Sequence, residues 1–420
     1  MALRRDLGSN LIALGVVKTR GVIQVVILSR LLGLSGYGIW VQAIAGASIV
    51  GMVSGLGLYQ AVVQFYPRAD DLGGRREVLF NALVPVVLTG LLVLILASLY
   101  VLVAPPFLPK PPATPAILLL GVMLGICYAL RLVVMNVARA RDELGRFAKQ
   151  SATSELLELT AVVGGALLGR TVTASMAGAL AGVGAMLLLL LWRERRDLAW
   201  APSAVRMRRA FHYSLPLVPT QLGDELLARG DRLLVGGILG ARAVGLYSVI
   251  YAFASLPQMV NIAMTTVLLP KLTTLQYVGT RAREVVRRSA MLYVGGALAV
   301  LVLVAFTLPF ALTLVLGADS THGGEPLRAV MIVIGLGVLC FGLGRLEALH
   351  LFVGERTRVV AAVWCTAAAI NISMNLLLLP RIGLMGAAIA TLASYALFLA
   401  GIRYVARVAQ PAATAPPGPP

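Results

Sequence analysis

The amino-acid sequence predicts an all-α membrane protein with twelve transmembrane helices in two parallel six-helix lobes around a central cavity. Hydrophobic residues make up 59% of the 420 residues and charged residues 13%, whereas soluble proteins average roughly 45–50% and about 25%. The mean hydropathy is +0.88. Uncharged stretches such as 31–67, 78–109 and 289–318 exceed the about 20 apolar residues that a membrane-crossing helix needs.

Proline, glycine and charged residues mark the ends of the predicted spans. The first six spans are expected at 8–33, 37–65, 78–103, 113–138, 151–169 and 172–192. The last six are expected at 211–239, 243–275, 289–316, 327–353, 359–380 and 383–407.

The distribution of Lys and Arg predicts the orientation. If both termini lie on one side, that side carries 23 of the 36 basic residues, the opposite side carries 5, and 8 fall within helices. Cytoplasmic loops collect Lys and Arg. We therefore expect a multi-pass protein of the cell (inner) membrane with both termini in the cytoplasm.

The net charge of +18 has the same explanation. Most of the excess lies in the cytoplasmic loops, where it contacts anionic headgroups of membrane lipids. Membrane lipids are therefore expected partners, and nucleic acid is not. The Pro-rich segment 411–420 is expected to be disordered.

An internal repeat divides the chain. Residues 31–40 read LLGLSGYGIW and residues 238–247 read ILGARAVGLY, an offset of 207. Each segment closes one predicted helix, turns at glycine and opens the next. The expected units are an N-terminal six-helix lobe at 1–200, which includes the start of a basic cytoplasmic linker, and a C-terminal six-helix lobe at 201–410. Because six is even, the lobes are parallel repeats, and transporters of this kind bind substrate between them.

Two segments resemble a known family. NLIALGVVKTRGVIQVVILSRLLGLSGYGIWVQAIA (10–45) and YSLPLVPTQLGDELLARGDRLLVGGILGARAVGLYSVIYAFASLPQ (213–258) are similar to helices 1–2 and 7–8 of bacterial polysaccharide flippases. These are the O-antigen and teichuronic-acid type members of the multidrug/oligosaccharidyl-lipid/polysaccharide exporter superfamily. The resemblance implies translocation of a polyprenyl-pyrophosphate-linked glycan by alternating access, with H⁺ or Na⁺ as coupling ion. Other polysaccharide-assembly proteins are further expected partners.

Charges inside the predicted spans are the candidate site residues, because an ionisable group in the bilayer costs at least about 2.5–3.5 kcal/mol and faces a cavity or a partner. The expected substrate cavity contains Lys18, Arg20, Arg131, Arg229, Arg232 and Arg345. Arginine suits a pyrophosphate because its planar fork binds phosphate oxygens in pairs. The alternative is that these bases form interlobe salt bridges or snorkel to the interface.

Helix 211–239 is the most highly charged, with five charges between 224 and 232 that follow Pro216 and Pro219. Its acids Asp224, Glu225 and Asp231 are expected to face the cleft and to carry the coupling ion. Glu225 can pair with Arg229 one turn away. The repeat also places Lys18 opposite Glu225, as a partner across the cleft.

Glu155 and Glu158 share one face near the cytoplasmic start of their helix. They are expected either to act in gating or simply to pair with Arg131, Arg139 or Arg146.

Enzymatic activity is not expected, and neither are cofactors or metals. The sequence contains no GxxxxGK[ST], HExxH or GxSxG motif. An O-antigen polymerase or ligase would present a large extracytoplasmic loop, whereas the longest here is near 317–326. A drug/cation antiporter of the same fold remains an alternative, although its cavity would be lined with acids.

Overall fold

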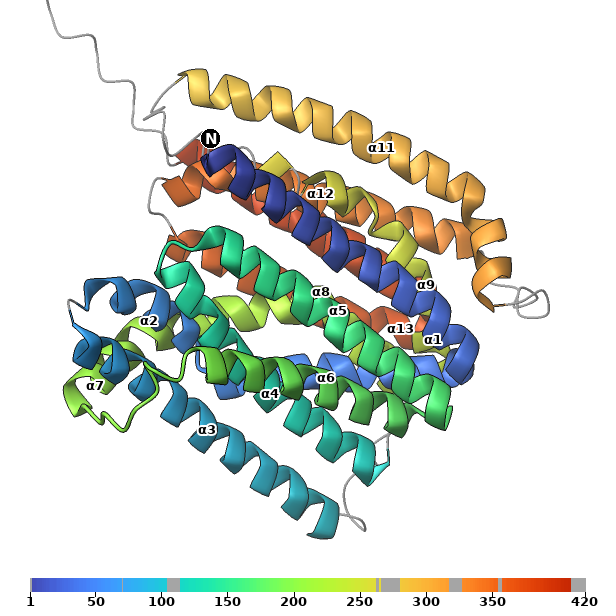
Figure 1. Ribbon diagram of the computed structural model, residues 1–420. Coiled ribbons are helices and arrows are strands. Elements are labelled where there is room, and N and C mark those ends of the chain that lie inside the picture. The colour runs from blue at the N-terminus through green and yellow to red at the C-terminus, as the bar shows by residue number, and fades with distance from the viewer. Residues whose placement is uncertain are drawn as a thin grey trace, which may run out of the picture.

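The computed structural model describes residues 2–69, 71–103, 114–261, 264–265, 280–316, 327–353 and 357–408. Over these ranges the chain is helical and has no β-strand, as predicted (Figure 1). The Pro-rich segment 411–420 lies outside them.

The N-terminal half contains α1 (Ala2–Gly55), α2 (Leu58–Phe65), the 3-10 helix η1 (Tyr66–Arg68), α3 (Leu72–Val103), α4 (Pro115–Ala140), α5 (Leu144–Gly169) and α6 (Val172–Arg193). The C-terminal half contains α7 (Ala204–Ser214), η2 (Leu215–Leu217), α8 (Val218–Leu239), α9 (Ala241–Ala254), α11 (Thr280–Leu316), α12 (Leu327–Val353) and α13 (Thr357–Val408).

Each of the twelve predicted spans overlaps one of these helices. The first two spans are joined in α1, which is kinked at Gly33, and the last two are joined in α13, which is kinked at Ile382 and Gly383. Over the described ranges, eight helices are long and apolar enough to cross a membrane. One of them, Val359–Arg407, has 49 residues, about twice the length that one crossing needs.

Several predicted boundaries differ from the structure, and two of them have a clear physical reason. Helix α5 begins at Leu144 rather than at 151. The prediction followed the apolar segment, whereas the first turns of the helix carry charges and extend beyond that segment. The predicted span 211–239 is interrupted by η2, which contains Pro216. A proline removes a backbone donor and clashes with the preceding turn, so α7 ends at Ser214 and α8 starts at Val218.

The repeated segments have the same backbone geometry. Gly33 has φ 69° and ψ 171°, and Gly240 has φ 87° and ψ 172°. These two glycines are 207 positions apart, the offset seen in the sequence. A residue with a Cβ atom rarely adopts this positive φ, so glycine lets each helix reverse direction within one residue.

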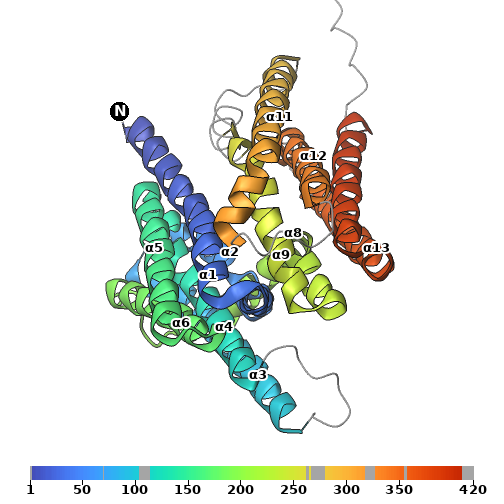
Figure 2. The same cartoon turned by 90° about the vertical axis from the view of Figure 1, so that its right-hand side faces the viewer.

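Figure 2 shows α5 and α6 on one side of the molecule and α11, α12 and α13 on the other, with α1, α8 and α9 between them. The halves meet where α1 contacts α8 and α9. Buried side chains from both halves, including Leu28, Trp40, Tyr247 and Phe398, form one continuous cluster. Apolar side chains such as Leu168 and Phe306 are exposed on the outer surface, as expected where a helix faces lipid.

Candidate functional site

A cavity of about 720 Å³ lies between the two halves, bounded by α1, α4 and α5 on one side and by α8, α9, α12 and α13 on the other. Its charged lining residues are Arg20, Arg131, Glu155, Glu158, Asp224, Glu225, Arg229, Arg232 and Arg345. Nine of the eleven candidate residues are therefore brought together around one space, although they come from five helices.

The N-terminal wall carries a compact charged cluster. Arg20 of α1 pairs with Glu155 and Glu158 of α5, and its Nη2 lies 2.7 Å from Glu158 Oε1. Glu158 is 2% exposed. It accepts a 2.7 Å hydrogen bond from the Tyr128 hydroxyl, and Arg131 Nη1 lies 3.6 Å from its second oxygen. Each charge in this cluster is compensated by a protein partner.

Helix packing explains this cluster. Glu155 and Glu158 are one turn apart and project from the same face of α5, which packs on α1 and α4. The expected pairing with Arg131 is confirmed for Glu158. Arg20 is the partner that the sequence did not indicate, and Arg146 bonds Glu143 instead.

Helix α8 supplies the charged residues of the opposite wall. The predicted pair of Glu225 and Arg229 forms, and Arg229 also donates to the Ser48 hydroxyl of α1. The carboxylate of Asp224 accepts a 3.0 Å hydrogen bond from Trp364 Nε1. No basic side chain among the described residues lies within ion-pair distance of Asp224.

The expectation that Asp231 faces the cleft is wrong. Its side chain does not line the cavity, and the residue is 2% exposed and accepts a 2.7 Å hydrogen bond from the Tyr247 hydroxyl of α9. Asp224 and Asp231 share one face of α8. At the level of Asp231, however, that face is covered by α9 and by Thr391 of α13, whose hydroxyl is 3.4 Å from that of Tyr247.

Within the described residues Glu225 pairs with Arg229 of its own helix, and the expected pair of Lys18 with Glu225 stays a prediction. The Lys18 side chain lies outside the described residues.

Aromatic rings support the two remaining arginines. The Arg232 guanidinium lies 4.5 Å from the centre of the Tyr251 ring, and its Nη1 donates to the Ala228 carbonyl at 2.7 Å. The Arg345 guanidinium lies over the Phe341 ring at 5.7 Å. Cation–π contacts of this kind contribute about 0.5–2 kcal/mol each.

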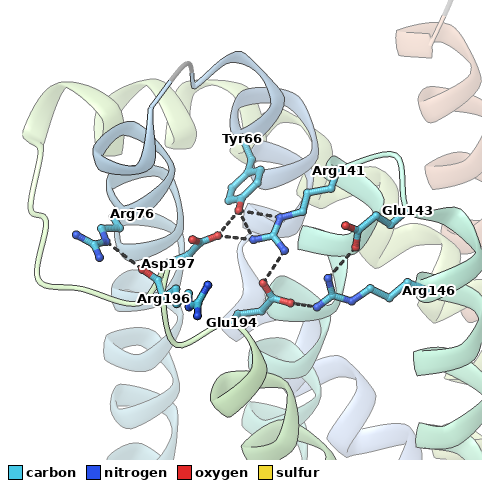
Figure 3. Close-up of polar contacts among 8 residues, drawn as sticks. All are labelled: Tyr66, Arg76, Arg141, Glu143, Arg146, Glu194, Arg196 and Asp197. Atoms are coloured by element: carbon cyan, nitrogen blue, oxygen red, sulfur yellow. Dashed lines mark hydrogen bonds and ion pairs between the residues drawn. The ribbon is translucent and has the colours of Figure 1, made fainter.

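A second polar cluster lies outside the cavity, where η1, the α4–α5 turn and the residues after α6 meet (Figure 3). Arg141 bonds Asp197 at 2.5 Å, Glu194 at 3.1 Å and the Tyr66 hydroxyl at 2.7 Å. Tyr66 also donates to Asp197.

Burial, together with the hydrogen bond to Asp197, raises the pKa of Tyr66 from 10.0 to about 12. Burial alone would lower the pKa of Arg141, but its bond to Tyr66 and the charges of Glu194 and Asp197 outweigh this, so that pKa is raised. The phenol therefore stays protonated and the guanidinium stays charged at neutral pH. This cluster fixes the start of the linker against the first lobe.

Sequence reasoning missed the aromatic residues of the site. Tyr128 and Trp364 hydrogen-bond cavity acids, and Tyr251 and Phe341 support cavity arginines. In an apolar helix an aromatic side chain resembles an ordinary core residue, so no sequence signal distinguished them. Over the described ranges no group of three or more His, Cys, Asp and Glu side chains could hold a metal ion.

Among the solved structures that this chain resembles are a lipid flippase and multidrug transporters. The lipid II flippase MurJ in an inward closed conformation matches with a TM-score of 0.79 at 14% identity, over 94% of this chain and 87% of that chain. An inward-facing multidrug resistance MATE family transporter of the MOP superfamily matches with a TM-score of 0.70 at 13% identity, over 95% and 94%. An outward-facing structure of such a transporter matches with a TM-score of 0.65 at 13% identity, over 96% of both chains.

At these identities the likeness shows the fold, which is that of twelve helices in two lobes. No curated protein matches the chain in sequence. The family model described as "Polysaccharide biosynthesis protein" matches residues 27–320, which is more than half of the chain. The chain therefore belongs to the polysaccharide biosynthesis protein family, within the fold shared by MurJ and the MATE transporters of the MOP superfamily.

Proposed function

We propose that this protein flips a lipid-linked oligosaccharide or polysaccharide precursor across the cytoplasmic membrane by alternating access. The observation that carries the proposal is the cavity between the lobes, whose lining includes five arginines. An arginine in the bilayer must be compensated by a partner or by water. A polar cavity of about 720 Å³ has room for a charged sugar headgroup, while a lipid chain stays in the bilayer.

The sign of the cavity charge favours an anionic substrate. Five arginines and four carboxylates line it, which leaves a positive excess when no substrate is bound. The pyrophosphate of a polyprenyl-linked glycan carries the opposite charge. Guanidinium groups bind such oxygens in pairs and stay charged at every working pH.

The position of the cavity supports an inward-facing state. Gly38 contacts Gly245 of the other lobe. The residues that come after Gly38 in the chain, from Trp40 to Tyr59, include many that line the cavity. At 1.5 Å per helical residue, the cavity therefore extends from near this contact toward the end of the molecule that carries the basic loops. With the termini in the cytoplasm, the outer side is closed and the inner side gives access.

Ion coupling is assigned most simply to Asp224. Of the three acids on α8, Glu225 is compensated by Arg229 and Asp231 is buried against Tyr247. Asp224 lines the cavity with one neutral donor, Trp364. Its carboxylate can therefore take up H⁺ or Na⁺ when the cavity is wet and release it when the surroundings change.

A drug/cation antiporter is the second candidate. Asp224 is the observation that favours it, because an acid with no basic partner in the described part of the chain could hold a cationic compound. The excess of arginine over carboxylate in the same cavity opposes this.

The test uses proteoliposomes that contain a fluorescent lipid-linked oligosaccharide. Protein-dependent loss of the lipid from the outer leaflet, measured with a membrane-impermeant quencher, is expected. A cationic dye is assayed in parallel. Dye transport together with no movement of the glycolipid would reject the flippase and favour the antiporter.

A further inference from the structure

The five arginines of the cavity are not equivalent. Four of them have a carboxylate oxygen within 4.0 Å. Arg20 pairs with Glu155 and Glu158, and Arg131 also lies beside Glu158. Arg229 pairs with Glu225, and Arg232 lies beside Asp231. Arg345 has none within the described part of the chain. It lies in α12, on the C-terminal wall, and is partly buried. Of the five cavity arginines, it is the one whose charge no carboxylate among the described residues neutralises.

The support under Arg345 is rigid and apolar. Phe341, one turn earlier in α12, is 6% exposed. Its ring stacks on Tyr395 with centroids 4.5 Å apart and meets Trp364 edge-on at 6.2 Å. The Tyr395 hydroxyl is anchored 3.3 Å from the Leu227 carbonyl. These contacts fix the ring over which the guanidinium lies.

The nature of this support decides what Arg345 can do. A ring face attracts a cation without occupying its hydrogen-bond donors. A carboxylate, in contrast, occupies both the charge and the donors, as Glu155 and Glu158 do for Arg20. The donor fork of Arg345 therefore stays available for a planar or tetrahedral anion, and phosphate oxygens match its geometry.

We propose that Arg345 is the docking point for the phosphate or pyrophosphate group of the substrate, and that Phe341 is its positioning residue. The N-terminal arginines Arg20 and Arg131 then serve as an internally compensated wall. The anion binds to one lobe only, so the lobe that carries it moves it during the rocking motion. This inference rests on the proposed function and refines it.

Asp224 lies on the same wall. Trp364 donates to its carboxylate at 3.0 Å and contacts the Phe341 ring. Asp224 and Arg345, which have no partner of opposite charge within the described ranges, are thus linked through the Trp364 and Phe341 rings. A substrate anion at Arg345 and a cation at Asp224 would balance the charge of this wall together.

The experiment measures binding to the purified full-length protein in detergent. Farnesyl pyrophosphate is the probe, and the fluorescence of Trp364 and the cavity-lining Trp40 is the signal. Arg345→Gln is expected to weaken binding about tenfold or more, which is the scale of a lost bidentate charge-assisted contact. Arg345→Lys is expected to fall between Arg345→Gln and the wild type, because an ammonium keeps the charge but not the fork.

The matched control is the double variant Arg403→Gln/Glu347→Gln, which removes one charge of each sign from an ion pair that does not line the cavity. Its affinity is expected to stay within about twofold of the wild type. Phe341→Leu keeps every charge, and it is expected to weaken binding while the dependence on salt stays that of the wild type. If Arg345→Gln does not give folded protein, Arg345→Lys and Phe341→Leu decide the question.

Competitors identify the source of the phosphate. Inorganic pyrophosphate is expected to displace the probe, and phosphatidylglycerol is not. Equal displacement by phosphatidylglycerol would make this a lipid-headgroup site and overturn the substrate assignment. Unchanged binding in Arg345→Gln, or loss in the control double variant alone, would overturn this inference while leaving the proposed function standing. No binding to the wild type would overturn both.

Discussion

Gly38 and Gly245 occupy equivalent positions in the two lobes and make reciprocal contacts. A Cβ atom on Gly38 would overlap the carbonyl oxygen of Ala241, and one on Gly245 would overlap the carbonyl oxygen of Leu34. Both pairs of residues are related by the offset of 207. The lobes thus touch backbone to backbone about a pseudo-twofold axis, beside the two glycine turns at Gly33 and Gly240.

This contact predicts the effect of a larger side chain. Gly38→Val must push α9 away from α1, at a cost of about 1–3 kcal/mol for overpacking. We expect lower thermal stability of the inward-facing state and reduced glycolipid flipping in proteoliposomes. Gly46→Ala in the same helix is the control, because nothing lies within 4 Å of its added Cβ. Equal effects of the two variants would show that the lobe contact is not specific.

Removal of Arg20 is expected to lower the stability of the fold rather than to act on transport directly. Arg20→Ala leaves Glu155 and the buried Glu158 without their main partner, and a buried charge that loses its partner costs about 3–5 kcal/mol. The melting temperature in detergent should fall and should recover in Arg20→Ala/Glu155→Gln/Glu158→Gln. A stable Arg20→Ala protein that has lost only flipping would instead assign Arg20 to the substrate.

Asp224 and Glu225 are neighbours on α8, and we expect only Asp224 to couple flipping to an ion gradient. Asp224→Asn is expected to abolish the response of flipping to an imposed proton or sodium gradient while substrate still binds, because this carboxylate has no basic partner among the described residues. Glu225→Gln is the matched comparison and should keep the gradient response, since its charge is compensated by Arg229. Gradient-driven flipping at wild-type rate in Asp224→Asn would remove Asp224 from the coupling mechanism.

The cluster of Figure 3 should stabilise the first lobe. Asp197→Asn removes the carboxylate that Arg141 and Tyr66 share, and we expect a loss of about 2–4 kcal/mol. The control is Glu143→Gln, whose side chain is 41% exposed and pairs with Arg146. An exposed pair contributes about 0–1 kcal/mol. Thermal unfolding followed by circular dichroism compares the two, and equal midpoints would contradict the assignment.

The proposed topology places α7 in the cytoplasm. In a variant without Cys127, Cys340 and Cys365, a cysteine at the exposed position Arg208 should react with an impermeant maleimide only after cell lysis. A cysteine at the exposed position Arg242, on the opposite side, should react in intact cells. The reverse labelling pattern would invert the orientation.

The helix order, the two-lobe repeat and the identity of most cavity charges were determined by the sequence alone. Apolar length, the distribution of basic loops and a glycine turn repeated at Gly33 and Gly240 are local or periodic signals. Charges inside a membrane span must face the interior wherever the helices pack. For this reason nine of the eleven candidates line one cavity.

The pairing of those charges was decided by the tertiary structure. Arg20 and Glu158 are 138 residues apart in the chain, and only the rotation of α1 against α5 brings them together. Asp231 shares a helix face with Asp224 but is covered by α9, and Arg345 is set apart because Phe341, rather than a carboxylate, lies beside it. Periodicity gives the direction of a side chain from its own helix axis, whereas its partner depends on how neighbouring helices pack.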